Sequence, residues 1–206
     1  MSRNDAPDGA AVAALGSEVW LEHSELDRNC GSERSGAAVW SRDAFLNIYQ
    51  SKVTKSSGGG DGGAIHIEER SYLDLAYVTL AENRCLGRGG GLFAMTTSTV
   101  LARAVIFALN CAYEGEDLYL DDEALLYEEC SLLDSTKVAG PGACITYQTA
   151  LQGDPGFVQS SGCGPDGESD YHLRIDSQCR NAQGCGAIGY AGLPKDGAEY
   201  AAPASR

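Results

Sequence analysis

The sequence predicts an all-β fold, a parallel β-helix of about five coils, and three observations support this prediction. First, Val19, Leu46, Leu73 and Val100 each begin a copy of one pattern, and each step along the chain is 27 residues. Second, apolar and polar residues alternate within each copy, which is the period of a β-strand. Third, the 26 glycines among 206 residues suit a chain that turns several times in every coil.

The longer strand of each coil lies in this repeated pattern. Its alternation places Val19 and Leu21 inside and Trp20 and Glu22 outside. A fifth copy begins at Leu125, after 25 residues, and places Tyr127 inside. If the period is one coil, equivalent residues are in-register neighbours about 4.8 Å apart. We therefore expect Leu46, Leu73 and Val100 to stack in the core.

A shorter strand precedes the longer one in each coil, and glycines come before it in most copies. Its first inward residues are spaced 27, 26, 27 and 26 apart: Val12, Val39, Ile65, Leu92 and Leu118. The next residue in each copy points outward, which gives the column Ala13, Trp40, His66, Phe93 and Tyr119.

Two further columns follow the longer strand. One is apolar and predicts a stack in the core, with members Leu26, Val53, Leu80, Phe107 and Leu132. The other is polar and lies at a turn, with members Asn29, Ser56, Asn83 and Asn110. Asparagine side chains can bond from one coil to the next and satisfy groups that a turn leaves open, so we assign these residues a structural role.

The pattern divides the chain into four parts. Residues 1–8 are expected to be a disordered leader, and 9–136 the β-helix coils. The spacing is lost after Leu133, so 137–192 are expected to hold a C-terminal coil and an irregular cap. Residues 193–206 are expected to be a disordered tail.

Eight cysteines without a C-x-x-C pair favour an oxidising compartment over a zinc site or a redox motif. The first seven residues lack the apolar segment of a signal peptide, and no stretch is apolar enough to span a membrane. We therefore expect an extracellular or cell-surface protein, and a chain that is the C-terminal part of a longer exported one.

One disulfide is predicted from the turn that holds the asparagine column. Cys85 lies two residues after Asn83 and Cys111 one residue after Asn110, so both occupy this turn in consecutive coils. The coil spacing of about 4.8 Å is within the Cα separation that a disulfide tolerates. Cys130 falls in an inward column and is expected to be a buried thiol, and the pairing of the remaining cysteines stays open.

The net charge of −14 excludes the usual partners of basic proteins. Nucleic acid and anionic membrane surfaces need a cationic face, and polyanionic polysaccharides are disfavoured for the same reason.

The C-terminal region carries a family resemblance in two segments, Asp154-Pro-Gly-Phe-Val158 and Asp170-Tyr-His-Leu173. Together with the glycine-led coils, they resemble secreted bacterial right-handed parallel β-helix proteins of pectate-lyase-like architecture. The closing segment departs from that family's pattern, because Gln178 replaces its proline and Asn181 its acidic residue. The resemblance implies a right-handed solenoid with a C-terminal cap, which we expect to cover the open strand edges of the last coil.

The outward rings of the shorter strand are the first candidate site. Trp40, His66, Phe93 and Tyr119 lie one above another, and aromatic rings on a flat sheet can stack against sugars, so they predict a carbohydrate-binding face. The alternative is that these rings pack only against their ladder neighbours.

The second candidate site is the pair Asp74 and Arg103, which the resemblance to pectate-lyase-like enzymes makes the catalytic candidates of a lyase. One Asp and one Arg cannot supply the six or more oxygens that Ca²⁺ needs, so a surface ion pair is preferred. An acidic segment that includes Asp121, Asp122 and Glu123 is the other weak candidate for Ca²⁺, the one cofactor considered. A solvated acidic face is the preferred interpretation of that segment.

The preferred function is therefore a non-catalytic extracellular or cell-surface β-helix scaffold that binds a polysaccharide or a cell-surface glycan. The alternative is a polysaccharide lyase or glycoside hydrolase whose catalytic residues lie partly outside this chain.

Overall fold

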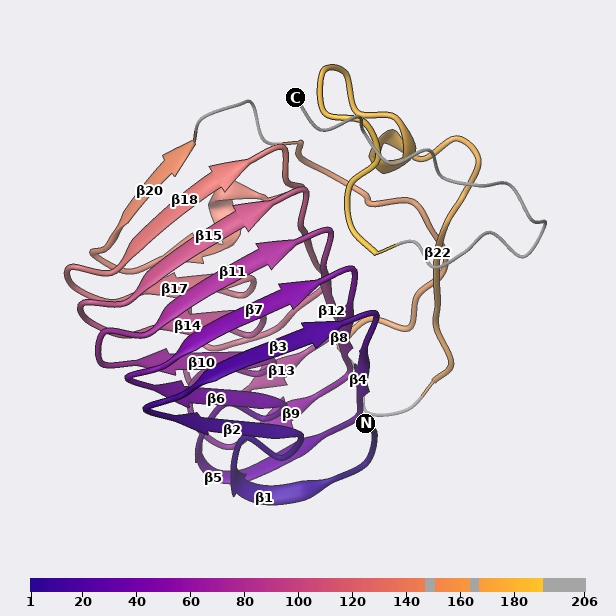
Figure 1. Ribbon diagram of the computed structural model, residues 1–206. Coiled ribbons are helices and arrows are strands. Elements are labelled where there is room, and N and C mark those ends of the chain that lie inside the picture. The colour runs from indigo at the N-terminus through magenta and orange to yellow at the C-terminus, as the bar shows by residue number, and fades with distance from the viewer. Residues whose placement is uncertain (147–150, 164–166, 191–206) are drawn as a thin grey trace.

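The chain folds as a parallel β-solenoid with almost no helix, which confirms the predicted fold class. The structure is a computed structural model that describes residues 1–146, 151–163 and 167–190. The described strands of the solenoid stack into four parallel sheets, and Figure 1 shows one of them rising from β3 to β20. Two short 3₁₀ turns, η1 (Ser135–Lys137) and η2 (Gln178–Arg180), are its helical elements in these residues.

Each sheet takes one strand from each successive coil. The long-strand sheet holds β3 (Glu18–Glu22), β7 (Phe45–Tyr49), β11 (Tyr72–Ala76), β15 (Thr99–Arg103), β18 (Leu125–Glu129) and β20 (Ala143–Thr146). The short-strand sheet holds β2 (Val12–Leu15), β6 (Val39–Arg42), β10 (Ile65–Glu68), β14 (Leu92–Ala94), β17 (Leu118–Leu120) and β19 (Val138–Ala139). The cap-facing sheet holds β4 (Glu25–Asp27), β8 (Lys52–Thr54), β12 (Thr79–Ala81) and β16 (Ile106–Ala108). The fourth sheet holds β1 (Asp5–Asp8), β5 (Cys30–Ser35), β9 (Ser57–Gly58) and β13 (Arg84–Cys85).

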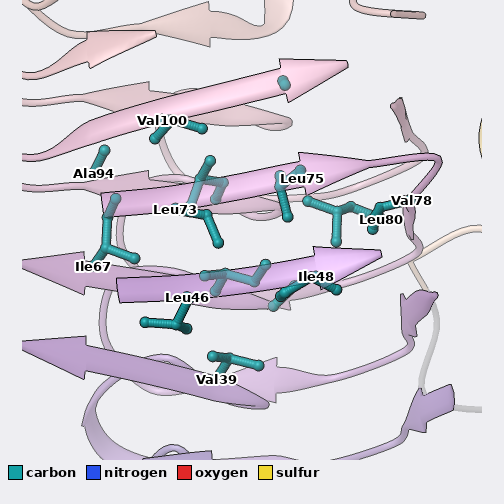
Figure 2. Packing of buried hydrophobic residues seen from close by; sticks show 14 of the residues in the cluster. Val39, Leu46, Ile48, Ile67, Leu73, Leu75, Val78, Leu80, Ala94 and Val100 are labelled. Carbon is teal, nitrogen blue, oxygen red and sulfur yellow. The ribbon is translucent and has the colours of Figure 1, made fainter. Parts of the chain in front are cut away.

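The core is a stack of aliphatic layers in the predicted register. Leu73 pairs with Leu46 on one side and with Val100 on the other, and all three side chains are fully buried. Figure 2 shows these residues one above another, with Val39 and Ile67 from the short-strand sheet facing them. The predicted inward column of the short-strand sheet, from Val12 to Leu118, is also confirmed by the pairing.

The register predicted for the fifth copy is wrong by one residue. Thr99 pairs with Leu125 and Val100 with Leu126, a step of 26 residues, so Leu126 points inward and Tyr127 outward. Both Leu125 and Leu126 are apolar, and the alternation therefore could not decide between them. The same shift places Leu133 in the main core, while Leu132 pairs with Ile106 and lies in a second, outer cluster.

The polar column at the turn is confirmed as a ladder of bonds between coils. The Asn110 side chain accepts from the backbone N–H of Asn83 at 3.0 Å and donates to the Leu80 carbonyl at 2.9 Å. Asn83 in turn accepts from the backbone N–H of Ser56 at 3.0 Å. These bonds satisfy buried backbone groups where the chain changes direction, as the structural interpretation requires.

The residue before each member of this ladder has a left-handed backbone. Arg28, Lys55, Glu82 and Leu109 have φ between 51° and 59°, although none is glycine. Such a conformation is uncommon for these residue types, and identical coils impose it at the same corner each time. The residue types at these corners therefore did not predict the left-handed backbone.

The first eight residues, expected to be a disordered leader, belong to the solenoid instead. Strand β1 (Asp5–Asp8) pairs with β5, and Ser2 pairs with Asp27. The predicted tail at 193–206 lies outside the described residues.

The C-terminal cap packs against the side of the solenoid, and in this respect the expected cover over the last coil is wrong. Its antiparallel hairpin, β21 (Phe157–Gln159) and β22 (Asp170–Leu173), lies beside the cap-facing sheet in Figure 1. Leu151 extends that sheet by pairing with Leu132, and the rest of the described cap lies over its outer face. The outer cluster between cap and sheet includes Ala81, Ile106, Ala108, Leu132, Phe157, Tyr171, Leu173 and Ile188.

Two disulfides join the solenoid to the cap, Cys111–Cys163 and Cys130–Cys185. The predicted Cys85–Cys111 bridge is wrong, because Cys111 pairs in register with Arg84 and neighbouring strand residues point to opposite faces. Cys85 is a buried free thiol, and burial raises its pKa to about 11. Cys130 is not a buried thiol, because it occupies the left-handed corner after β18 and bonds to the cap.

Candidate functional site

The aromatic column of the short-strand sheet stacks as predicted, but its rings are largely covered. Ring centroids are 4.7 Å apart for His66 and Phe93 and 5.5 Å apart for Phe93 and Tyr119. The exposed fractions are only 5% for His66, 1% for Phe93 and 8% for Tyr119. Of the four predicted glycan-binding residues, Trp40 alone is partly exposed, so these rings do not form the open platform that the sequence suggested.

The cover over these rings is Arg88. Its guanidinium lies 4.8 Å from the Phe93 ring centroid and 4.7 Å from that of Tyr119. Asp61 holds it there, with an ion pair of 2.8 Å and a second bond from the Arg88 backbone N–H at 2.7 Å. The pKa of Arg88 is raised, first by the hydrogen bond to Asp61. Gly62 (φ 75°), which follows Asp61, lets the loop that carries Asp61 lie close to His66, because a Cβ at position 62 would be 2.8 Å from that of His66.

Several aromatic side chains reach solvent on the outer face of the long-strand sheet. Trp20 is 61% exposed, Phe45 59% and Tyr49 38%. Phe45 lies 5.9 Å from Tyr72 between ring centroids, and Tyr49 meets the edge of Tyr77 at 6.0 Å. The rings thus form an apolar surface across neighbouring coils, which is typical of interaction sites.

A shallow hollow of about 260 Å³ lies on this face. Tyr49, Ala76 and Arg103 are in register on successive strands, and the small side chain of Ala76 leaves space between the two large ones. The residues that line the hollow are Trp20, Glu22, Asn47, Ile48, Tyr49, Asp74, Ala76 and Arg103. The hollow therefore combines aromatic surface with amide, carboxylate and guanidinium groups.

Asp74 and Arg103 are brought together at one wall of the hollow, as the predicted surface ion pair. One guanidinium nitrogen of Arg103 donates to both carboxylate oxygens of Asp74, at 2.8 and 2.9 Å. The pair is partly exposed, so the contact contributes little to stability. Arg103 also lines the hollow, and its guanidinium has further N–H groups that can donate to a ligand.

The residues considered for Ca²⁺ do not assemble into a site. Asp121, Asp122 and Glu123 lie in the turn between β17 and β18, and the last two are exposed. In the described part of the chain, no three His, Cys, Asp or Glu side chains are grouped so that they could hold a metal ion.

The sequence did not predict the hollow, although it placed Trp20 and Glu22 outside and Asp74 and Arg103 on the surface. The sequence feature that could have indicated an exposed aromatic surface is the pair Phe45 and Tyr72. These residues occupy the first outward position of two consecutive long strands, and Trp20 lies nearby on the same face. These rings are exposed because no segment among the described residues covers them, and the periodicity of the strands does not predict this.

Comparison with protein-family models, curated proteins and solved structures found no match to this chain. The class that the structure defines is thus a parallel β-solenoid with a laterally docked, disulfide-linked cap, and the pectate-lyase-like resemblance stays a prediction. No helix in the described residues has the length and apolarity needed to cross a membrane.

Proposed function

We propose that the chain is a non-catalytic extracellular or cell-surface scaffold that binds a neutral glycan in the hollow of the long-strand sheet. The observation that carries this proposal is the combination in the hollow of exposed rings with directed polar groups. Trp20 and Tyr49 offer ring faces or edges to a sugar, and Asn47, Asp74 and Arg103 offer acceptors and donors to its hydroxyls.

Charge supports a neutral ligand over an acidic one. The hollow holds two carboxylates, Glu22 and Asp74, against one guanidinium, and the whole chain carries a net charge of −14. A polyanion would be repelled at low salt.

The cysteine chemistry supports the proposed location outside the cytosol. Both disulfides close long loops, with partners 52 and 55 residues apart, and such bonds persist in oxidising compartments.

The test compares two tryptophans on different faces. Trp20→Ala removes the exposed ring beside the hollow, whereas Trp40→Ala removes the partly exposed ring of the short-strand sheet. We expect Trp20→Ala and Tyr49→Ala to weaken retention on insoluble cellulose, chitin or xylan, and Trp40→Ala to leave it unchanged. The loss per ring should be about 3- to 10-fold, since such contacts are individually weak.

Three results would contradict the proposal. Retention lost only in Trp40→Ala would move the site to the short-strand sheet. Equal binding by all variants and wild type would show that neither the long-strand face nor the short-strand face holds the glycan site. Release of unsaturated sugars from pectate in Ca²⁺ would favour the lyase, with Asp74→Asn and Arg103→Lys as the next variants.

A further inference from the structure

A buried carboxylate, Glu82, lies between the solenoid and the cap. It occupies the left-handed corner that follows β12 and is 2% exposed. Its neighbours at this corner in the adjacent coils are Lys55 and Leu109. Among these corner residues, Glu82 is the one in the buried class, and Lys55 and Leu109 are partly buried.

In the described residues, the donors that bond to this carboxylate all belong to the cap. The backbone N–H groups of Ser161 and Gly162 donate to it at 2.6 and 2.8 Å. The hydroxyls of Ser161, Ser169 and Tyr171 donate at 3.1, 2.8 and 2.8 Å. Five donors from a segment about 80 residues later in the chain thus converge on a single side chain.

The charged groups around Glu82 favour its ionised form. Lys55 is 3.7 Å away and its side chain is 3% exposed. Lys55 and Arg28 also donate to the Gly167 carbonyl of the cap, and Lys52 lies 5.9 Å from the centroid of the Tyr171 ring. Asp27, the last residue of β4 and two coils away from Glu82, pairs with Arg28 and accepts a hydrogen bond from Thr54.

Protonation would disturb this arrangement because a neutral acid must donate one hydrogen bond. Two of the five donors are backbone N–H groups that cannot become acceptors, and Lys55 would lose its nearest counter-charge while nearly buried. Burial raises the pKa of Glu82, but the bonds from Ser169, Tyr171, Gly162 and Ser161 outweigh it and lower the pKa below its ordinary value.

We propose that Glu82 is an acid-sensitive latch for the cap: its ionised carboxylate docks the cap on the cap-facing sheet, and its protonation releases the cap while the coils stay folded. Cys111–Cys163 and Cys130–Cys185 keep the released cap tethered, so that docking is restored at neutral pH. The outer face exposed by release carries the apolar residues Ala81, Ile106 and Ala108.

The lowered pKa of Glu82 determines how docking of the cap changes with pH. The docking energy due to Glu82 is fully present above its ordinary pKa of 4.5 and is lost as the pH falls through the lower value it has in the docked state. Release is therefore expected below pH 4.5, and neutral pH favours docking.

The test is hydrogen exchange resolved by peptide, corrected for the intrinsic effect of pH, on the oxidised full chain. Between pH 7 and pH 3, amides of residues 157–163 and 168–173 should lose protection by about tenfold or more, the effect of losing one hydrogen bond to a charged group. Amides of β11 and β15 should keep theirs. Glu82→Gln, which resembles the protonated acid, should show the loss already at pH 7, and Glu123→Gln in an exposed turn should behave as wild type.

Simultaneous loss of protection in cap and coils would overturn the latch, because acid would then unfold the whole molecule. Unchanged cap protection in Glu82→Gln at pH 7 would also overturn it. If Glu82→Gln does not fold, the wild-type titration decides by itself, since the two regions are measured in the same sample.

Discussion

Leu73 shows at the scale of one residue why the stack is specific. Its side chain is fully buried between Leu46 and Val100, and its neighbours in sequence, Tyr72 and Asp74, point outward. A shift of one residue would exchange these two faces, so the alternation fixes the register wherever both faces differ in polarity.

Replacing Leu73 with aspartate should therefore strongly destabilise the coils. The substitution places a carboxylate between two apolar layers and should lower the free energy of unfolding by several kcal/mol, about 3–5. The matched control is Leu15→Asp, since Leu15 is 68% exposed and should tolerate the charge within about 0.5 kcal/mol. Denaturant unfolding measures both, and equal midpoints for the two variants would count against the stack.

At the scale of strands, the sequence predicted register where its period was constant. The strands β3, β7, β11 and β15 repeat every 27 residues, and their pairing agrees with that spacing. The prediction became wrong at β18, where the step is 26 residues and two adjacent leucines leave the face undecided.

The position of the cap was not predictable in the same way, because the cap has no period. A signal was nevertheless present in the outward column of the cap-facing sheet. Glu25 and Lys52 in the first coils give way to Thr79, Ile106 and Leu132, and apolar residues on an outward face need a cover. The exposure of the hollow was not predictable for the same reason. The sequence pattern identified the strands that form it, but not that the described segments would leave it uncovered.

The disulfides are the element-scale prediction. Peptide mapping under non-reducing conditions should give Cys111–Cys163 and Cys130–Cys185, with Cys85 alkylated only after unfolding because it is buried. Cys130→Ser opens a loop with ends 55 residues apart and should lower the free energy of unfolding by about 4 kcal/mol. Cys30→Ser is the control, since Cys30 is an exposed free thiol. A Cys85–Cys111 peptide would show that the pairing at this corner is different.

At the scale of the whole molecule, acid acts in opposite directions on the coils and on the cap. Inside the solenoid, burial raises the pKa of Asp117 and of Glu128 above their ordinary values of 3.8 and 4.5. The folded coils therefore take up protons that the unfolded chain has released. Stability from these two groups is greatest below their ordinary pKa values and declines as the pH rises through the raised ones, the reverse of Glu82.

We accordingly expect the melting temperature of the coils to increase as the pH is lowered from 8 toward 5, while the cap stays docked. Relief of the repulsion due to the net charge of −14 acts in the same direction, so the measurement belongs in about 0.5 M salt, where surface charges are screened. The double variant Asp117→Asn, Glu128→Gln should lose most of this dependence, and Glu123→Gln should retain it. Equal slopes in the double variant and wild type would assign the effect to surface charge. A decrease in melting temperature over the same range would contradict the raised pKa values, because it would show that the hydrogen bonds from Asn110 to Asp117 and from Ser131 to Glu128 outweigh burial.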